Sequence, residues 1–232
     1  MADDVTKPML EGPALAVTGM RIKRTVEALK RNRFDARVVA HASEIPALIE
    51  SLVEEGQTVA HGGSQTLKEC GVIDLLSSGK YHFIEHGAGM SKEQAWEADH
   101  AALSADWYFM SANAITENGE LYNVDGNSNR VAALCYGPRH VVVVAGSNKI
   151  VRDLDEAVIR MKTLAAPANA IRLGCRTYCA QRGECVSLTA AAPLLADGCS
   201  SPDRICCSYV VTSFQRVPDR ITVILTPESL GF

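Results

Sequence analysis

The stretch HVVVVAG, residues 140–146, decides the fold of this chain. Its β-branched valines favour an extended strand, and the run is far shorter than the roughly 20 residues that span a bilayer. DWYFM, residues 106–110, is a second nearly continuous apolar run. Strands that are apolar on both faces are typical of parallel sheets covered by helices on both sides. The two runs therefore predict a buried, mostly parallel sheet.

Further helices and strands alternate on either side of these runs. Helical patterns cover residues 20–34, 45–53, 92–105 and 153–164, whereas strand patterns cover residues 36–40, 58–61, 81–85, 106–110, 120–124 and 140–146. This order predicts an α/β fold with a mostly parallel sheet and helices on both faces.

The chain length of 232 residues fits one domain, residues 1–232. After Pro167 the periodicity ends, and residues 174–207 are irregular and rich in cysteine. Two more strands, residues 207–212 and 220–226, are expected to return to the sheet. The cysteine-rich segment is therefore predicted to be an insertion near the C-terminus.

Composition excludes several classes of protein. The formal net charge is −4 and aromatic residues make up 6%, so the chain offers neither a basic face nor stacking platforms for nucleic acid. The first residues, MADDVTKPMLEG, are acidic and lack the apolar core of a secretory signal. We expect a cytoplasmic protein without a membrane span.

Six of the eight cysteines lie between residues 175 and 207. Thiolates are soft ligands, and in a reducing cytosol such a cluster binds zinc or an iron–sulfur cluster more often than it forms disulfides. The spacing matches neither paired CxxC motifs nor a ferredoxin motif, so disulfides and plain buried thiols stay open as alternatives. Cys70 and Cys135 stand alone and are expected in the core.

The loop HGGSQT, residues 61–66, joins a predicted strand to a predicted helix. Backbone N–H groups at Gly62 and Gly63 and the hydroxyls of Ser64 and Thr66 are suited to bind a phosphate or carboxylate. The alternative is a tight turn in which Ser64 merely caps the helix.

Polar residues gather after two later strands and predict a ligand cleft at the carboxyl end of the sheet. Turn and capping chemistry is the alternative for the Asp125-Gly126 region, and a solvated surface position is the alternative for the lysine. The candidate ligand-binding side chains are Asn113, Asn127, Asn129, Arg130 and Lys149, and the candidate acid–base groups are Asp125 and Glu117.

Several segments closely resemble the lactate-utilisation, or LUD, domain family in its cysteine-bearing branch. They are SANAITENGELYNVDGNSNRVAALCYGP (111–138), VVVVAGSNKIV (141–151), AAPANAIRLG (165–174), SPDRIC (201–206) and the GGSQTL loop. The resemblance implies a fold like that of sugar-phosphate isomerases and CoA transferases, in which a glycine loop and strand ends bind phosphorylated or acyl ligands. It also implies a link to bacterial L-lactate oxidation, in which a related subunit accompanies iron–sulfur partner proteins.

The resemblance matches four cysteines to a recurrent metal-binding pattern: Cys179, Cys185, Cys199 and Cys206. The chain departs from that pattern in its long VSLTAAAPLLADG stretch, in Tyr178 where proline is more usual, and in the additional Cys175 and Cys207. Either additional cysteine could replace one of the four as a ligand.

Three functions compete on this basis. The first is a redox or electron-transfer accessory of lactate or hydroxy-acid metabolism, with a cysteine-bound metal or iron–sulfur centre. The second is a sugar-phosphate-type isomerase or transferase that uses Asp125 or Glu117 as acid and base. The third is a binding module for an acyl or phosphate ligand with structural zinc. The sequence leaves the oligomeric state open.

Overall fold

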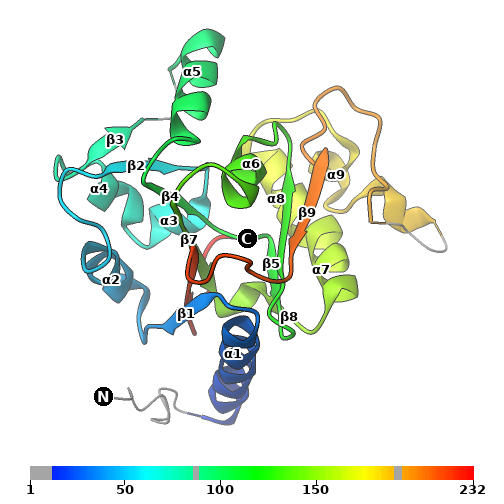
Figure 1. Cartoon of the computed structure of the whole chain (residues 1–232). Coiled ribbons are helices and arrows are strands. Elements are labelled where there is room, and N and C mark those ends of the chain that lie inside the picture. Colours follow the sequence, from blue (N-terminus) through cyan, green and yellow to red (C-terminus); the bar gives the residue numbers. More distant parts are fainter. Residues whose placement is uncertain (1–11, 86–88, 191–194) are drawn as a thin grey trace.

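The computed structural model describes residues 12–85, 89–190 and 195–232 (Figure 1). The acidic stretch at residues 1–11 lies outside them. Six parallel strands form the main sheet in the order β1 (Asp35–Val38), β10 (Ile221–Thr226), β7 (His140–Gly146), β4 (Trp107–Met110), β2 (Thr58–His61) and β3 (His82–Ile84). The predicted α/β fold with a mostly parallel sheet is confirmed.

Strand β7 lies inside this sheet, between β10 and β4. Its side chains alternate between two apolar cores: Val141 and Val143 pack on one face, whereas Val142 and Val144 pack on the other. All four valines are fully buried. This double burial explains why the run is apolar at every position.

Helices cover both faces of the main sheet. One core is closed by α1 (Pro13–Arg31), the end of α5 (Lys92–Ala102) and α6 (Asn129–Cys135). The opposite core is closed by α2 (Ile45–Glu50), α3 (Gln65–Glu69) and α4 (Val72–Leu76). Every crossover between parallel strands needs a long connection, and these helices supply it.

A second, four-stranded sheet lies beside the main one. Its order is β8 (Ile150–Val151), β5 (Ala114–Thr116), β6 (Leu121–Asp125) and β9 (Ser208–Thr212). The strands predicted at residues 120–124 and 207–212 belong here and pair antiparallel, so their expected place in the main sheet was wrong. A short turn joins β5 to β6, which allows only an antiparallel hairpin. The strand predicted at residues 220–226 does join the main sheet, as β10.

The helix predicted at residues 153–164 runs further than expected. It comprises α7 (Leu154–Arg160), a π-helical turn (Met161–Ala165) and α8 (Ala166–Arg172). Proline breaks a regular helix because it lacks an N–H and its ring clashes with the preceding turn. The wider π-helical turn directly before α8 lets the chain continue through Pro167.

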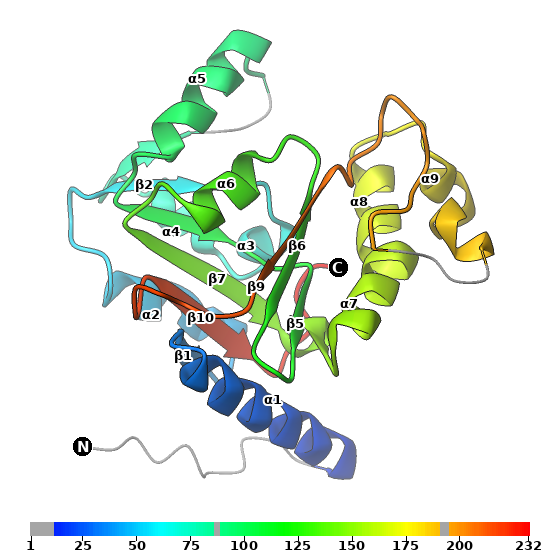
Figure 2. The same cartoon turned by 45° about the vertical axis from the view of Figure 1, so that its right-hand side comes forward.

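The cysteine-rich segment follows α8 and carries α9 (Tyr178–Arg182) and a 3-10 turn (Val186–Thr189) on the outer side of α8 (Figure 2). Residues 191–194, part of the long stretch between Cys185 and Cys199, lie outside the described residues. In the described parts of the chain, no helix has the length and apolar character needed to cross a bilayer.

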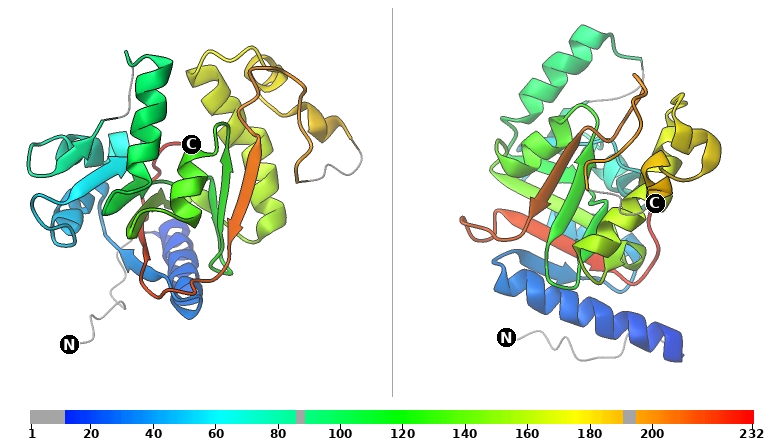
Figure 3. Two further views of the ribbon diagram at one scale, coloured as in Figure 1. Left: turned by 45° about the horizontal axis from the view of Figure 1, so that its top comes forward. Right: turned by 90° about the vertical axis from the view of Figure 1, so that its right-hand side faces the viewer.

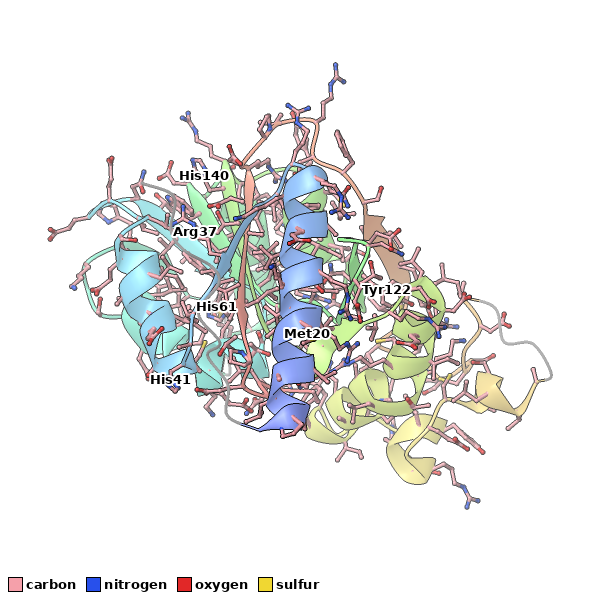
Figure 4. All side chains as sticks on the ribbon, turned by 90° about the horizontal axis from the view of Figure 1, so that it is seen from below. Met20, Arg37, His41, His61, Tyr122 and His140 are labelled. Atoms are coloured by element: carbon pink, nitrogen blue, oxygen red, sulfur yellow. The ribbon has the colours of Figure 1, made fainter. Side chains whose placement is uncertain are left out.

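Helix α1 bridges the two sheets. It packs against β1 of the main sheet, and its Arg21 donates a hydrogen bond to the carbonyl of Ile150 in β8. Figure 4 shows α1 between the side of the molecule that carries Arg37 and the side that carries Tyr122. The helix therefore fixes the position of the second sheet relative to the first, and with it the space between their strand ends.

Candidate functional site

A cavity of about 290 Å³ opens where the strand ends of the two sheets meet. The glycine loop after β2, Ser111 and Asn113 after β4, the polar stretch after β6 and Lys149 after β7 all contribute to its wall. Helix α8 and Phe232 close the other side, and Figures 2 and 3 show the end of the chain between the main sheet and the α7–α8 helices. The ends of strands from both sheets thus bring together residues that are far apart in the sequence.

The structure brings most of the predicted ligand-binding residues to this one cavity. Gly62 and Glu117 are not part of its wall. The predicted residues that line it are Gly63, Ser64, Thr66, Asn113, Asp125, Asn127, Asn129, Arg130 and Lys149.

Lys149 is buried in the wall, with 4% of its surface exposed. Its Nζ lies 2.8 Å from Thr66 Oγ1 and 3.0 Å from Ser111 Oγ, and it donates to both hydroxyls. Burial, together with the positive charges of Arg160 and Arg130 and against a smaller opposing effect of Glu69, lowers the pKa of Lys149 from 10.5 to about 7. In the described part of the chain no carboxylate forms an ion pair with this amine. Lys149 is therefore a desolvated amine rather than a solvated surface lysine.

Arg130 connects the strand ends that form the polar part of the cavity wall. Its guanidinium donates hydrogen bonds to the side-chain oxygens of Asn113 (3.2 Å) and Asn123 (2.8 Å) and to the carbonyls of Ser111 (3.0 Å) and Val124 (2.7 Å). These bonds connect the ends of β4 and β6. Most donors of Arg130 are thus committed to the protein, and its contribution to the cavity is mainly its charge.

Gly62 explains how Arg130 can lie so close to the glycine loop. A Cβ atom at Gly62 would come within 2.9 Å of both Arg130 Cδ and the Tyr108 hydroxyl. The glycine is required by this close packing. Ser64, two residues on, accepts a hydrogen bond from the backbone N–H of Leu67 at 3.3 Å, so it caps α3 while it also lines the cavity.

Asp125 is engaged in turn and helix-start geometry. One carboxylate oxygen accepts from the N–H of Gly126 at 2.9 Å, and the other accepts from the N–H of Val131 at 3.1 Å. The Nε of Arg130 lies 3.9 Å away. Asn129 donates to Asp99 of α5 at 2.7 Å. The turn-chemistry alternative therefore accounts for these contacts of Asp125, although its side chain borders the cavity.

Glu117 lies away from the cavity, at the turn between β5 and β6. Its carboxylate accepts hydrogen bonds from Arg21 and Arg24 of α1, both at 2.8 Å. Burial opposes ionisation of Glu117, but these arginines outweigh it and lower its pKa. Glu117 and Asp125 are thus not assembled as a catalytic pair; Glu117 fastens α1 to the second sheet.

Sequence reasoning missed the basic residues that α7, α8 and the cysteine-rich segment bring to this region. Arg172 and Arg204 line the cavity, together with Asn169 of α8. Arg160 of α7 is buried behind it and donates to the carbonyls of Asn148 (3.0 Å) and Asn113 (2.6 Å). Its position three residues after the buried Ala157, on the helix face that packs inward, was the available signal.

The four cysteines matched by resemblance, Cys179, Cys185, Cys199 and Cys206, line one small cavity of about 20 Å³. Cys175 and Cys207 are not part of its wall, and all eight cysteines are free thiols. As they stand, no three His, Cys, Asp or Glu side chains among the described residues form a group that could hold a metal ion. Cys70 is buried as expected, whereas Cys135 is exposed because it ends α6 at the surface.

Burial raises the pKa of the Cys179 thiol, and the neighbouring Cys199, Cys206 and Cys185 add to this effect. The cysteine cavity also adjoins the larger one. Met161 and Ala166 contribute to both walls. The cysteine-rich segment is therefore built against the same helix that closes the ligand cavity.

Arg204 connects the two cavities. It lines the larger one, and its guanidinium donates to the carbonyls of Cys206 (2.8 Å) and Cys199 (3.2 Å). The positive charge of Arg204 therefore lies beside two of the four cysteines.

The family model of the LUD domain matches residues 22–226. A DUF162 family protein from Deinococcus radiodurans, solved at 1.70 Å, aligns with 93% of this chain and 99% of its own at 16% identity and a TM-score of 0.47.

Two further solved structures, from Chaetomium thermophilum, also align. The eIF2B beta structure gives 17% identity and a TM-score of 0.34 over 51% of this chain and 42% of its own. The eIF2B delta structure gives 19% identity and a TM-score of 0.33 over 64% of this chain and 60% of its own. No curated protein matches the chain. Because the family model covers nearly the whole sequence, the chain belongs to the LUD domain family of lactate-utilisation-related proteins.

Proposed function

We propose that this protein binds a small organic anion in the larger cavity and a metal or iron–sulfur centre at the four cysteines, as a redox accessory of lactate or related hydroxy-acid metabolism. The main support for the anion site is the net positive charge of the cavity wall. Four basic side chains but one acidic side chain line the cavity: Arg130, Lys149, Arg172 and Arg204 against Asp125. An anionic ligand would offset this excess of positive charge.

The low exposure of Lys149 and Arg130 strengthens the argument. Among the described residues the Nζ of Lys149 forms hydrogen bonds to two hydroxyls and no ion pair, and the buried cation Arg160 lies nearby. Charges in a poorly solvated site interact more strongly than charges in water, so an anion would gain more here than at the protein surface. The volume of about 290 Å³ suits a small metabolite. Family membership favours a hydroxy- or oxo-carboxylate over a phosphate as that ligand.

The cysteine cavity suits a metal in its donor chemistry. Four thiolates are the ligand set of structural zinc and of iron–sulfur clusters. The thiols face one small space, and rotation of the cysteine side chains would be needed to bring their sulfurs onto a common ion. Bound there, iron–sulfur would supply one-electron transfer, whereas zinc would only stabilise the segment. The guanidinium of Arg204 would offset part of the thiolate charge.

Ligand titration tests the anion site. L-Lactate, inorganic phosphate and uncharged glycerol are each added to the purified protein, and its melting temperature and the heat of binding are recorded. We expect an anion, lactate before phosphate, to protect the fold, and glycerol to have no effect. Lys149→Met should weaken anion binding at least tenfold, whereas the exposed Lys68→Met serves as the matched control. Equal protection in both variants would place the site elsewhere.

Metal analysis tests the cysteine centre. The protein is purified without oxygen, and iron, zinc and the visible absorption spectrum are measured. Cys179→Ser and Cys206→Ser should each lose bound metal, whereas Cys175→Ser and Cys207→Ser, outside the cavity, should retain it. Iron with visible absorption supports the redox role, and zinc alone supports a binding module. Full metal content in the first two variants would contradict the ligand assignment.

A further inference from the structure

We propose that Lys149 is a nucleophile that forms an imine with the carbonyl carbon of a small 2-oxo acid bound in the cavity. This inference rests on the proposed anion site and deepens it, because it specifies the ligand as an oxo-carboxylate and gives the lysine a covalent role. The supporting observations are the burial of the amine, the nature of its partners and its position on the cavity wall.

A lysine attacks a carbonyl only as the neutral amine, because the ammonium form has no lone pair. A carboxylate partner would hold Lys149 in the charged form. Its partners are instead two neutral hydroxyls, at 2.8 Å and 3.0 Å, and no carboxylate of the described residues forms an ion pair with it. Burial, followed by the charges of Arg160 and Arg130, lowers the pKa to about 7, so a large fraction of the amine is neutral at physiological pH.

The amine is also held in a defined position. Lys149 lies in the turn after β7, and its two partners come from other strand ends: Thr66 follows β2 and Ser111 follows β4. Thr66 is fixed in turn, since its hydroxyl donates to the carbonyl of Leu230 at 3.2 Å. A nucleophile held between the start of α3 and the end of β4 keeps its orientation when the ligand arrives, which lowers the entropic cost of reaction.

One of these hydroxyls also has a chemical use. In imine formation the nitrogen lone pair attacks the carbonyl carbon, and one proton passes from nitrogen to the former carbonyl oxygen to give a carbinolamine. The carbinolamine hydroxyl and the second nitrogen proton then leave together as water, which gives the imine. The step needs no oxidant or reductant. Ser111 lies within hydrogen-bond distance of the reacting nitrogen and can relay these protons to the oxygen, whereas the Thr66 hydroxyl donates its proton to Leu230.

Charge selects an oxo acid over a neutral ketone. Two other basic side chains, Arg172 and Arg204, line the wall and would attract the carboxylate of the ligand by their charge, while Asn127 offers an amide. Most donors of Arg204 are already bonded to the protein. A 2-oxo acid places its carbonyl one bond from the carboxylate, so the carboxylate near these cations brings the carbonyl toward Nζ. A hydroxy acid such as lactate shares the carboxylate but lacks the reactive carbonyl, which makes it the natural control.

Reductive trapping tests the proposal. The intact protein is incubated with pyruvate and sodium borohydride, which reduces an imine to a stable secondary amine, and peptides are mapped by mass spectrometry. We expect one adduct per chain, on Lys149, with none on Lys149→Met and none when L-lactate replaces pyruvate. The distribution over lysines in the wild type decides the result even if the variant folds poorly.

Two outcomes would overturn the covalent role: adducts spread over exposed lysines such as Lys68, or no adduct although pyruvate protects the fold against heat. In the second case the anion site survives, since lactate and pyruvate would still bind without covalent chemistry. Failure of both lactate and pyruvate to protect the fold would instead contradict the proposed function itself.

Discussion

Replacement of Lys149 by methionine should change how the stability of the protein depends on pH. In the unfolded chain this lysine keeps its proton up to about pH 10.5, whereas in the folded protein it loses the proton at about pH 7. Between these values unfolding takes up a proton. The contribution of Lys149 to the free energy of unfolding therefore rises with pH across this window, and the cost of the buried charge is fully present below pH 7.

The magnitude follows from the two pKa values. Each pH unit between them corresponds to about 1.4 kcal/mol, so the folded state is about 5 kcal/mol less stable below pH 7 than it would be with a permanently neutral group. Methionine removes this cost but also removes two hydrogen bonds, each of which contributes about 1 kcal/mol. Lys149→Met should therefore be about 2–3 kcal/mol more stable than the wild type at pH 7.

Denaturant unfolding at several pH values between 7 and 9 measures this effect. The decisive quantity is the difference between wild type and Lys149→Met, because all other titrating groups, the thiols included, are common to both proteins and cancel. We expect the advantage of the variant to shrink by about 1.4 kcal/mol per pH unit as pH rises. Lys68→Met controls for loss of a lysine charge at the surface. Parallel curves for wild type and Lys149→Met would refute a desolvated lysine at this site.

Three further substitutions test other contacts of the site. Gly62→Ala places a methyl group within 2.9 Å of Arg130. Thermal denaturation should show that the free energy of unfolding falls by about 1–3 kcal/mol, and lactate titration should show weaker binding. An unchanged melting temperature would contradict the close packing. Glu117→Gln weakens the ion pairs with Arg21 and Arg24 of α1, so the free energy of unfolding should fall by about 1 kcal/mol while the affinity for lactate stays unchanged. A large drop in lactate affinity would instead indicate that Glu117 acts in the cavity. Arg160→Gln removes a positive charge near Lys149 and should therefore raise the pKa of Lys149. The pH at which borohydride trapping reaches half its maximum should then move upward. An unchanged midpoint would exclude this electrostatic effect.

Local sequence signals predicted much of the main sheet and of the cavity wall. The valines of β7 indicated a strand buried on both faces, because the need for apolar side chains at every position is a local property. The glycine loop and Lys149 were grouped correctly at one end of the sheet because parallel strands direct their carboxyl ends to the same edge. In these cases the rule that links sequence to position needs no knowledge of distant contacts.

The misplaced residues depended on partners far away in the chain. Glu117 follows a buried strand just as Asn113 does, but its two arginine partners lie more than 90 residues earlier in α1. Strand β6 has the composition of a sheet strand, yet nothing within it specifies which sheet it joins. Of its two partners, β5 is close in the sequence, but β9 lies more than 80 residues later. Pairing over such separations is invisible to periodicity.

The wall between the two cavities shows why the connection of the sites was also missed. In a regular α-helix of 3.6 residues per turn, residues five apart lie on different faces. In the π-helical turn the N–H of Ala166 donates to the carbonyl of Met161, five residues earlier, and both residues then line both cavities. Such turns occur frequently at functional sites. A helical wheel extended from residues 153–164 to Ala166 separates these positions, whereas the actual backbone brings Met161 and Ala166 to the wall shared by the cysteine cavity and the Lys149 cavity. Met161 is therefore a side chain that borders both the cysteines and the anion site.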